Sequence, residues 1–308
     1  MSESRGTVLV TGATGLIGKQ TLIPLVERGF AVHAVARRVP NLRRRGTTWQ
    51  MADLLDPAAR AAVIDVAKPT HLLHLAWVTE HGAFWEDPSN DAWLDASQDL
   101  VQRFVAAGGK RVVVAGTCAE YDWTDPSLRK GRCVEQTTPC APSTRYGRAK
   151  LALGRSIGDL TGSAASGRVF LLYGDGEAPG RLVPSVIDNL LKGNPAELGP
   201  GELERDFLDA KTVGAAFAAL LASDVTGPVN IASGKPRTIE DVATMVGSII
   251  GKPELIKLGA RPGRPEDPPR LVADVNRLMG EVGFDPAFDL RGSLTALIER
   301  RRLAMSAA

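Results

Sequence analysis

The sequence lacks several features that would place it in a specialised class of protein. No stretch approaches the roughly 18 uninterrupted apolar residues that a membrane helix needs. The formal net charge is only +2, and the basic runs Arg43 to Arg45 and Arg300 to Arg302 are short, so we interpret them as solvated surface and expect no nucleic acid or membrane partner. The N-terminus has no charged segment followed by an apolar run, as secretory signals have, and we expect a cytoplasmic protein.

Cysteine and histidine are scarce as well. The three cysteines, Cys118, Cys133 and Cys140, are an odd number without the spacing of metal ligands, which fits a reducing compartment. The four histidines form no pair four residues apart and no array with cysteines or carboxylates. The sequence therefore predicts no structural or catalytic metal.

What the chain does contain is an alternation of short apolar runs and segments with helical spacing. The expected strands are 7–10, 30–36, 72–76, 111–115 and 168–172, and the expected helices include 16–28, 58–67 and 94–107. Strands that alternate with helices form a parallel sheet with both faces covered. We therefore predict an α/β fold of the Rossmann type, a doubly wound parallel sheet.

The length of 308 residues suggests one large domain with a smaller one. After the fifth expected strand, proline and glycine become frequent and the alternation weakens. We expect residues 1–174 to form the Rossmann domain, with later segments of about 205–235 interleaved, and residues 175–308 to form mainly the smaller domain.

A glycine-rich turn separates the first expected strand from the first expected helix. It has the spacing GxxGxxG, which allows a tight turn, a close approach of a pyrophosphate to the backbone and close helix packing. The alternative is a turn with a structural role only. The sequence favours a dinucleotide site, for which the candidate residues are Gly12, Thr14, Gly15, Leu16, Ile17 and Gly18.

Two arginines, Arg37 and Arg38, follow the second expected strand. Sites that are specific for NAD commonly carry an acidic residue there, which binds the ribose 2′-hydroxyl. A guanidinium instead makes charge-assisted hydrogen bonds to the 2′-phosphate of NADP. The sequence thus favours NADP(H) over NAD(H), unless both arginines are merely surface charges at a strand end.

Tyr146 and Lys150 are four residues apart and share one face if their segment is helical. A neighbouring ammonium favours the phenolate and lowers the pKa of a tyrosine, which suits proton transfer. Thr117 follows a buried strand at the carboxyl edge of the sheet, where ligands of such folds bind. These three residues are the candidate catalytic groups.

Together these segments resemble the extended short-chain dehydrogenase/reductase family, in its branch of nucleotide-sugar epimerases, dehydratases and reductases. The resemblance covers nearly the whole chain. It rests further on Asp53-Leu54, which resembles the adenine-contacting pair, on His74-Leu75-Ala76, which resembles a segment along the cofactor, and on the segments 116–121, 168–174 and 205–209.

The resemblance implies site residues that the patterns alone do not give. Asp53, Leu54, Leu75, Ala76 and Trp77 join the expected cofactor site, together with Tyr146 and Lys150. The smaller domain is expected to bind substrate, and Arg205 and Arg261 resemble the arginines that hold the diphosphate of a nucleotide sugar. Cys118, Glu120 and Val183 complete the expected substrate site. The resemblance also implies a homodimer that forms through paired helices.

The chain departs from the family pattern at two places. Cys118-Ala119 stands where the dehydratases carry Asp-Glu, which argues against dehydration, although Glu120 lies one position later and either substitutes or supports the loop. Leu171 replaces a frequent asparagine of the substrate strand. Cys118 is interpreted as a buried, unreactive thiol. Trp77, Trp85 and Trp93 either line a pocket or pack in the core.

These residues favour an NADPH-dependent reductase of a keto group on a nucleotide-linked deoxysugar. In this reading Tyr146 gives a proton to the substrate oxygen, Thr117 holds that oxygen, and Lys150 lowers the pKa of Tyr146 and binds the nicotinamide ribose. A nucleotide-sugar epimerase is the main alternative, and a dehydratase or a cofactor-binding sensor without turnover are others.

Overall fold

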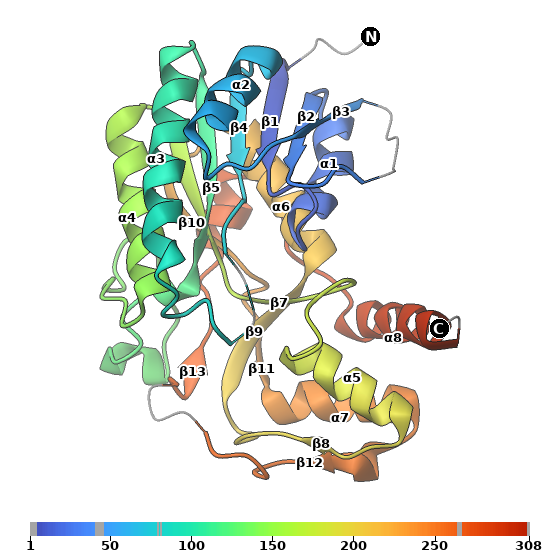
Figure 1. The fold of residues 1–308 in the computed structure, drawn as a ribbon. Coiled ribbons are helices and arrows are strands. Elements are labelled where there is room, and N and C mark those ends of the chain that lie inside the picture. Colours follow the sequence, from blue (N-terminus) through green and yellow to red (C-terminus); the bar gives the residue numbers. More distant parts are fainter. Residues whose placement is uncertain (1–4, 41–45, 79, 81, 264–266, 307–308) are drawn as a thin grey trace.

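Among the residues that the structure describes, seven parallel strands form the main sheet (Figure 1). The computed structural model describes residues 5–40, 46–78, 80, 82–263 and 267–306. The strand order is β10-β6-β5-β4-β1-β2-β3. The strands are β1 (Thr7–Thr11), β2 (Ala31–Ala36), β3 (Thr47–Met51), β4 (His71–His74), β5 (Arg111–Thr117), β6 (Ala164–Val169) and β10 (Gly227–Ile231). The order reverses between β1 and β4, the type of point at which ligands of doubly wound sheets bind.

Helices cover both faces of this sheet (Figure 1). One face carries α2 (Pro57–Ala67), α3 (Ser89–Ala106) and α4 (Arg145–Leu160), and the other carries α1 (Gly18–Glu27) and α6 (Ala210–Ala222). Successive side chains of β1 point to opposite faces, so Val8 and Val10 belong to one core and Leu9 to the other. The predicted α/β fold is therefore confirmed.

A smaller part lies beyond the carboxyl edge of the main sheet (Figure 1). It contains the strands β7 (Leu171–Tyr173), β9 (Glu204–Asp209), β11 (Pro236–Thr238), β13 (Arg270–Leu271), β8 (Ala196–Glu197) and β12 (Ile256–Lys257). Its helices are α5 (Leu182–Lys192), α7 (Ile239–Ile250) and α8 (Leu290–Ser306), which pack on a core of their own. Short helical turns span Cys118–Glu120, Pro126–Arg129, Pro253–Leu255 and Arg277–Glu281.

Several predicted elements differ from the structure, among them α3, which starts at Ser89 and not at residue 94. The expected strand 168–172 is two strands, because β6 ends at Val169 in the main sheet while β7 pairs with β9 in the smaller one. The expected helix 16–28 starts only at Gly18. Leu16 and Ile17 precede the helix and line a cavity, and Ile17 also packs against the main core.

The division of the chain at residue 174 stays a prediction. Strand β10 comes after residue 174 in the sequence, but it belongs to the main sheet, where it pairs with β6. The Arg43 to Arg45 run lies outside the described residues, as do residues 264–266 of the irregular stretch. Among the described residues no helix is both long and apolar enough to span a membrane.

Candidate active site

The glycine turn connects the end of β1 to α1 and packs closely against β4. Gly12 has a φ of +64°, and a Cβ there would lie 2.7 Å from the backbone nitrogen of Ala76. A Cβ on Gly18 would lie 2.1 Å from the Gly12 carbonyl oxygen. At Gly15 the same oxygen, at 3.1 Å, is the nearest neighbour of an added Cβ. Gly12 and Gly18 are therefore needed for packing, whereas an added Cβ at Gly15 would meet only the Gly12 oxygen, to which the Gly15 N–H donates at 2.9 Å.

Thr11 fixes the other side of this turn. Its Oγ1 accepts the backbone N–H groups of Leu75 and Ala76 at 3.1 and 3.2 Å, and it also bonds His74 Nδ1 at 2.8 Å. Burial lowers the pKa of His74 to about 3, so the imidazole is neutral. The residues after β4 are thus held beside the glycine turn.

A cavity of about 430 Å³ runs along the turn and the carboxyl ends of β1, β2 and β4. The predicted cofactor residues that line it are Gly12, Thr14, Gly15, Leu16, Ile17, Gly18, Arg37, Leu54, Leu75, Ala76 and Trp77. Trp93 lines it as well. Asp53 is not among the lining residues, because its carboxylate turns back to accept the N–H of Leu55. The shape and lining fit an extended ligand with phosphate groups.

Arg37 and Arg38 follow the end of β2, and both are exposed. They form a shallow hollow with Thr14 that adjoins this cavity. Neither arginine makes an ion pair within the described part of the chain, so both guanidinium groups are open to an anionic group.

Thr117, Tyr146 and Lys150 come together in a second cavity of about 550 Å³. Thr117 ends β5, and its hydroxyl caps the following helical turn by accepting the N–H of Ala119. Tyr146 and Lys150 lie on α4, whose first turn is capped by Thr144. The helix predicted for the Tyr/Lys pair is therefore present.

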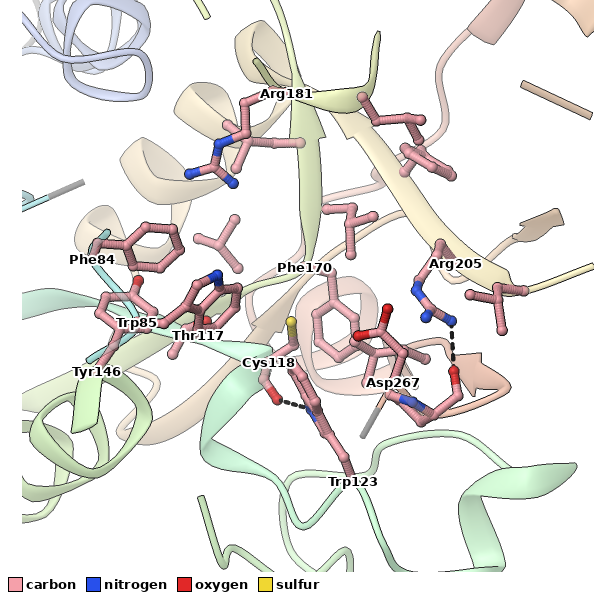
Figure 2. Close-up of a pocket in the computed structure, with 18 of the residues that line it drawn as sticks. Phe84, Trp85, Thr117, Cys118, Trp123, Tyr146, Phe170, Arg181, Arg205 and Asp267 are labelled. Carbon is pink, nitrogen blue, oxygen red and sulfur yellow. Dashed lines mark hydrogen bonds between the residues drawn. The ribbon is translucent and has the colours of Figure 1, made fainter. Parts of the chain in front are cut away.

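The two cavities share part of their lining, so a ligand in one reaches a ligand in the other. The shared residues are Ile17, Leu75, Trp77, Leu172, Glu177 and Arg181. Figure 2 shows Thr117, Tyr146 and Trp85 on one side of the second cavity, with Arg205 and Asp267 on the other. A hydride donor bound in the first cavity can therefore lie against a substrate in the second cavity, next to the phenol of Tyr146 and the hydroxyl of Thr117.

The electrostatics of the Tyr/Lys pair differ from the expectation. Lys150 Nζ donates to the Ala115 carbonyl oxygen at 2.9 Å and lies 3.9 Å from the centre of the Trp77 ring. Burial lowers the pKa of Lys150 to about 7, although the negative charge of Glu120 acts to raise it. Burial also raises the pKa of Tyr146, and a hydrogen bond with Thr117 opposes that rise. The expected lowering of the Tyr146 pKa is not found in this structure: burial raises that pKa, and the groups that oppose the rise are Thr117 and Arg181.

Four of the five expected substrate residues, Cys118, Val183, Arg205 and Arg261, line the second cavity. Burial raises the pKa of Cys118 to about 12, so its thiol stays protonated at neutral pH. Arg205 Nη1 donates to the carbonyl oxygens of Glu204 and Pro268 at 2.9 and 2.8 Å. Arg261 is exposed at the rim.

Glu120 is the exception, because it lies behind the cavity wall. Its side chain is 1% exposed, and Oε2 pairs with Arg168 Nε at 2.7 Å. Oε1 accepts the backbone N–H of Thr117 at 2.8 Å. Of the two roles left open by the sequence, the structure places Glu120 in support of the catalytic loop, and its inclusion among the substrate contacts is corrected.

Several cavity residues were missed by sequence reasoning. Phe84, Trp85, Trp123 and Phe170 form an aromatic wall, of which the sequence indicated only Trp85. Phe84 meets the Tyr146 ring edge-on with ring centres 4.9 Å apart, and Trp85 does so at 5.9 Å. The signal in the sequence for such a wall was the cluster of tryptophans after His74-Leu75-Ala76.

Three charged residues were also missed, and they lie in loops without a sequence pattern. Asp267 lines the cavity near Arg205, and Glu177 and Arg181 lie between β7 and α5. Burial raises the pKa of Glu177 to about 7. Among the described residues there is no cluster of three or more histidine, cysteine or acidic side chains that could hold a metal ion.

Comparison with known proteins gives a consistent set of relatives. A UDP-glucose 4-epimerase of Rhizobium leguminosarum bv. trifolii is 25% identical over 315 residues, covering 92% of this chain and 94% of the relative. A dTDP-4-dehydro-6-deoxy-D-allose reductase of a Streptomyces species is 26% identical over 306 residues, covering 91% of each. The crystal structure of the Thermus thermophilus UDP-glucose 4-epimerase in complex with NAD matches with a TM-score of 0.83 and 25% identity, covering 96% of this chain and 99% of that one.

These relatives are nucleotide-sugar epimerases and reductases, as the sequence predicted, and the match makes the chain an enzyme of the NAD(P)-dependent, extended short-chain type. Residues 8–232, which include the glycine turn, Thr117, Tyr146 and Lys150, match a single family model. The chain therefore belongs to the NAD dependent epimerase/dehydratase family.

Proposed function

We propose that the protein is an NADPH-dependent reductase that acts on a keto group of a nucleotide-linked deoxysugar. The observation that carries this proposal is the pair Arg37 and Arg38 at the end of β2, beside Thr14. Two guanidinium groups without an ion-pair partner in the described chain suit a 2′-phosphate and form charge-assisted hydrogen bonds with it. The phosphorylated cofactor fits a reaction with net reduction, since an epimerase regenerates its cofactor within each turnover.

The residues around the first cavity fit the dinucleotide. The glycine turn and the start of α1, which has no side-chain cap, line one part of the cavity and suit a pyrophosphate, and Arg37 lines another part at the end of β2. When bound, NADPH supplies a hydride to the carbonyl carbon of the substrate. Tyr146 gives its proton to the carbonyl oxygen, so that the ketone becomes an alcohol, and Thr117 donates a hydrogen bond to the same oxygen.

The second cavity supports a deoxygenated sugar as substrate. Its wall includes Phe84 and Trp85 beside Tyr146, and Trp123 and Phe170 farther along, which offer apolar surface where sugar hydroxyls would need hydrogen-bond partners. Arg205 and Arg261 line the same cavity and suit a diphosphate. The name of the Streptomyces relative describes a reductase of a nucleotide-linked 6-deoxy sugar.

The test is to incubate the protein with NADPH and dTDP-4-keto-6-deoxyglucose and to follow both NADPH absorbance and sugar products. We expect one NADPH to be consumed for each sugar alcohol formed, and turnover by the Tyr146→Phe variant to be slower by about 10²–10⁴-fold. Interconversion of sugars without net loss of NADPH contradicts a reductase.

A UDP-sugar 4-epimerase is the second candidate, because two of the relatives described above are UDP-glucose 4-epimerases. It predicts equilibration of UDP-glucose with UDP-galactose in the presence of NAD, with no net change in the cofactor. Incubation with these two sugars separates the candidates directly.

We also infer a homodimer. Helices α3 and α4 pack side by side on the outer face of the main sheet (Figure 1), where paired helices of two copies would meet. Light scattering on the purified protein tests this, and a monomeric mass at micromolar concentration contradicts it.

A further inference from the structure

Asn90 lies in the first turn of α3 and is 0% exposed. Its Oδ1 accepts the indole N–H of Trp77 at 2.8 Å. Its Nδ2 donates to the carbonyl oxygens of Phe84 and Asp87, both at 2.8 Å. A half-turn of the amide would set its oxygen against two carbonyl oxygens, so the three bonds fix its orientation. One buried side chain thus fastens two separate segments to the same helix.

The first of these segments carries Trp77, which lines both cavities. The centre of its ring lies 3.9 Å from Lys150 Nζ and 6.3 Å from the ring centre of Trp93, which also lines the first cavity. An indole has a single N–H donor, so the bond to Asn90 fixes the orientation of the ring. Asn90 therefore holds in place a wall that the two cavities share.

The second segment carries Phe84 and Trp85 to the start of α4. Their rings meet the Tyr146 ring edge-on, with ring centres 4.9 and 5.9 Å apart. The backbone N–H of Tyr146 donates to the carbonyl oxygen of Trp85 at 3.0 Å. Figure 2 shows both rings beside Tyr146 and Thr117. This wall of the substrate cavity is thus bonded to α4 at Trp85 and to Asn90 of α3 at Phe84.

We propose that Asn90 is a positioning residue whose carboxamide holds Trp77 and Phe84 in a fixed relation, so that a bound nicotinamide and the substrate carbonyl meet at reacting distance. The inference rests on the proposed function, which supplies the hydride transfer. Asn90 lines neither cavity and acts through the two rings. Hydride transfer depends strongly on this relation, because a displacement of about 1 Å can cost about 10²-fold in rate.

Asn230 on β10 provides a matched structural control. It is also 0% exposed and lines neither cavity. Its Oδ1 accepts the hydroxyl of Tyr121 at 2.8 Å, and its Nδ2 donates to the carbonyl oxygens of Cys133 and Asp274 at 2.8 and 3.0 Å. Both asparagines therefore bond one aromatic side chain and two backbone carbonyls. A loss that is common to both measures folding, and a loss that is confined to Asn90 measures positioning.

The experiment compares wild type, Asn90→Leu, Asn90→Asp and Asn230→Leu with NADPH and dTDP-4-keto-6-deoxyglucose. It measures the single-turnover rate of hydride transfer with both ligands saturating, the dissociation constant of NADPH, the KM of the sugar and the thermal unfolding midpoint. Leucine is close to asparagine in size and removes all three bonds. We expect Asn90→Leu to lose about 10–100-fold in transfer rate. Asn230→Leu should unfold at a lower temperature but keep the wild-type transfer rate.

Asn90→Asp separates the contact with Trp77 from the contact with the Phe84 segment. An aspartate keeps the acceptor for the indole N–H but loses at least one of the two N–H donors. We expect the KM of the sugar to rise about tenfold, because Phe84 is released. The dissociation constant of NADPH should be unchanged, because Trp77 keeps its partner. This variant also decides the question if Asn90→Leu does not fold.

Three results overturn the proposal. They are a wild-type transfer rate in a folded Asn90→Leu, equal losses of rate in Asn90→Leu and Asn230→Leu, and equal losses of NADPH and sugar affinity in Asn90→Asp. If the wild type interconverts UDP-glucose and UDP-galactose without consuming cofactor, the proposed function fails instead. The rate of that interconversion at saturating sugar, which also requires hydride transfer, then tests Asn90 in the same variants.

Discussion

The ammonium of Lys150 lies 3.9 Å from the centre of the Trp77 ring and 5.9 Å from that of Tyr146. Lys150 is 3% exposed, and the carboxylate that favours its charged form, Glu120, is already paired with Arg168. The folded protein therefore holds a cation whose hydration is replaced mainly by one carbonyl and one aromatic face. This has a measurable effect on stability.

Replacing Lys150 with Met should change how stability depends on pH. Burial lowers the pKa of Lys150 from 10.5 to about 7, so between these values the unfolded chain binds the proton and the folded one does not. Below about pH 7 the buried ammonium destabilises the folded state to its full extent. This destabilisation disappears as pH increases from about 7 to about 10.5. Lys150→Met should be more stable than wild type near pH 6, on the order of a few kcal/mol, and lose this advantage by about pH 10.

Urea denaturation of both proteins without cofactor, at several pH values, measures this difference. Parallel pH dependences in the two proteins contradict a buried ammonium. The variant should also lose most of its turnover, which shows that the charge is kept for function at the expense of stability.

Arg37→Ala should weaken NADPH binding much more than NADH binding. Loss of a charge-assisted contact to the 2′-phosphate is expected to cost about tenfold in the dissociation constant for NADPH. The ratio of the two dissociation constants, from fluorescence titration, is the measurement. Arg28→Ala, which removes an arginine after the end of α1 and outside the cavities, is the control. An equal loss for both cofactors refutes the assignment of Arg37 to the phosphate.

Tyr146→Phe should reduce kcat about 10²–10⁴-fold, the range for loss of a general acid. The phenyl ring preserves the edge-on contacts with Phe84 and Trp85, so the fold and NADPH affinity should be kept. Single-turnover rates with excess enzyme check the chemical step. A single-turnover rate close to that of wild type is incompatible with Tyr146 as proton donor.

Arg168→Met should destabilise the protein strongly, because it leaves Glu120 buried without its partner. The Arg168 and Glu120 side chains are 6% and 1% exposed, and the loss of one member of such a pair costs about 3–5 kcal/mol. The control is Arg103→Met, which breaks the more exposed pair with Asp99 and should cost less than about 1 kcal/mol. The double variant Arg168→Met with Glu120→Gln should recover part of the loss. If Arg168→Met and Arg103→Met lose similar amounts of unfolding free energy, the burial of the Arg168–Glu120 pair does not make it more important for stability.

The sequence was sufficient for the parts of the site that belong to the main sheet. Gly12, Thr117 and Tyr146 each stand at a fixed place relative to a strand end or helix start, and the parallel sheet brings such places together. Arg181 and Asp267 could not be predicted in this way. They come from loops whose position depends on how the smaller part packs. No periodic pattern in the sequence indicates where such loops lie.

Glu120 illustrates a different limit. Its place one residue after the positions of the family's acid/base pair suggested a contact with substrate. The side chain instead accepts the backbone N–H of Thr117 and pairs with Arg168, which is not among the residues that line the cavity. A sequence gives the order of residues along a loop but not the side to which a carboxylate turns.

The passage of the chain from the main sheet to the smaller one at Phe170 bears on how new specificities can arise. Val169, Phe170 and Leu171 all line the second cavity, and the strands on either side of Phe170 pair with different sheets. Changes at this crossing disturb the packing of both sheets, whereas Val183 on α5 and Ile239 on α7 line the cavity from one layer only. Engineering or natural divergence toward another sugar is thus expected to begin on these two helices, with the dinucleotide turn left untouched.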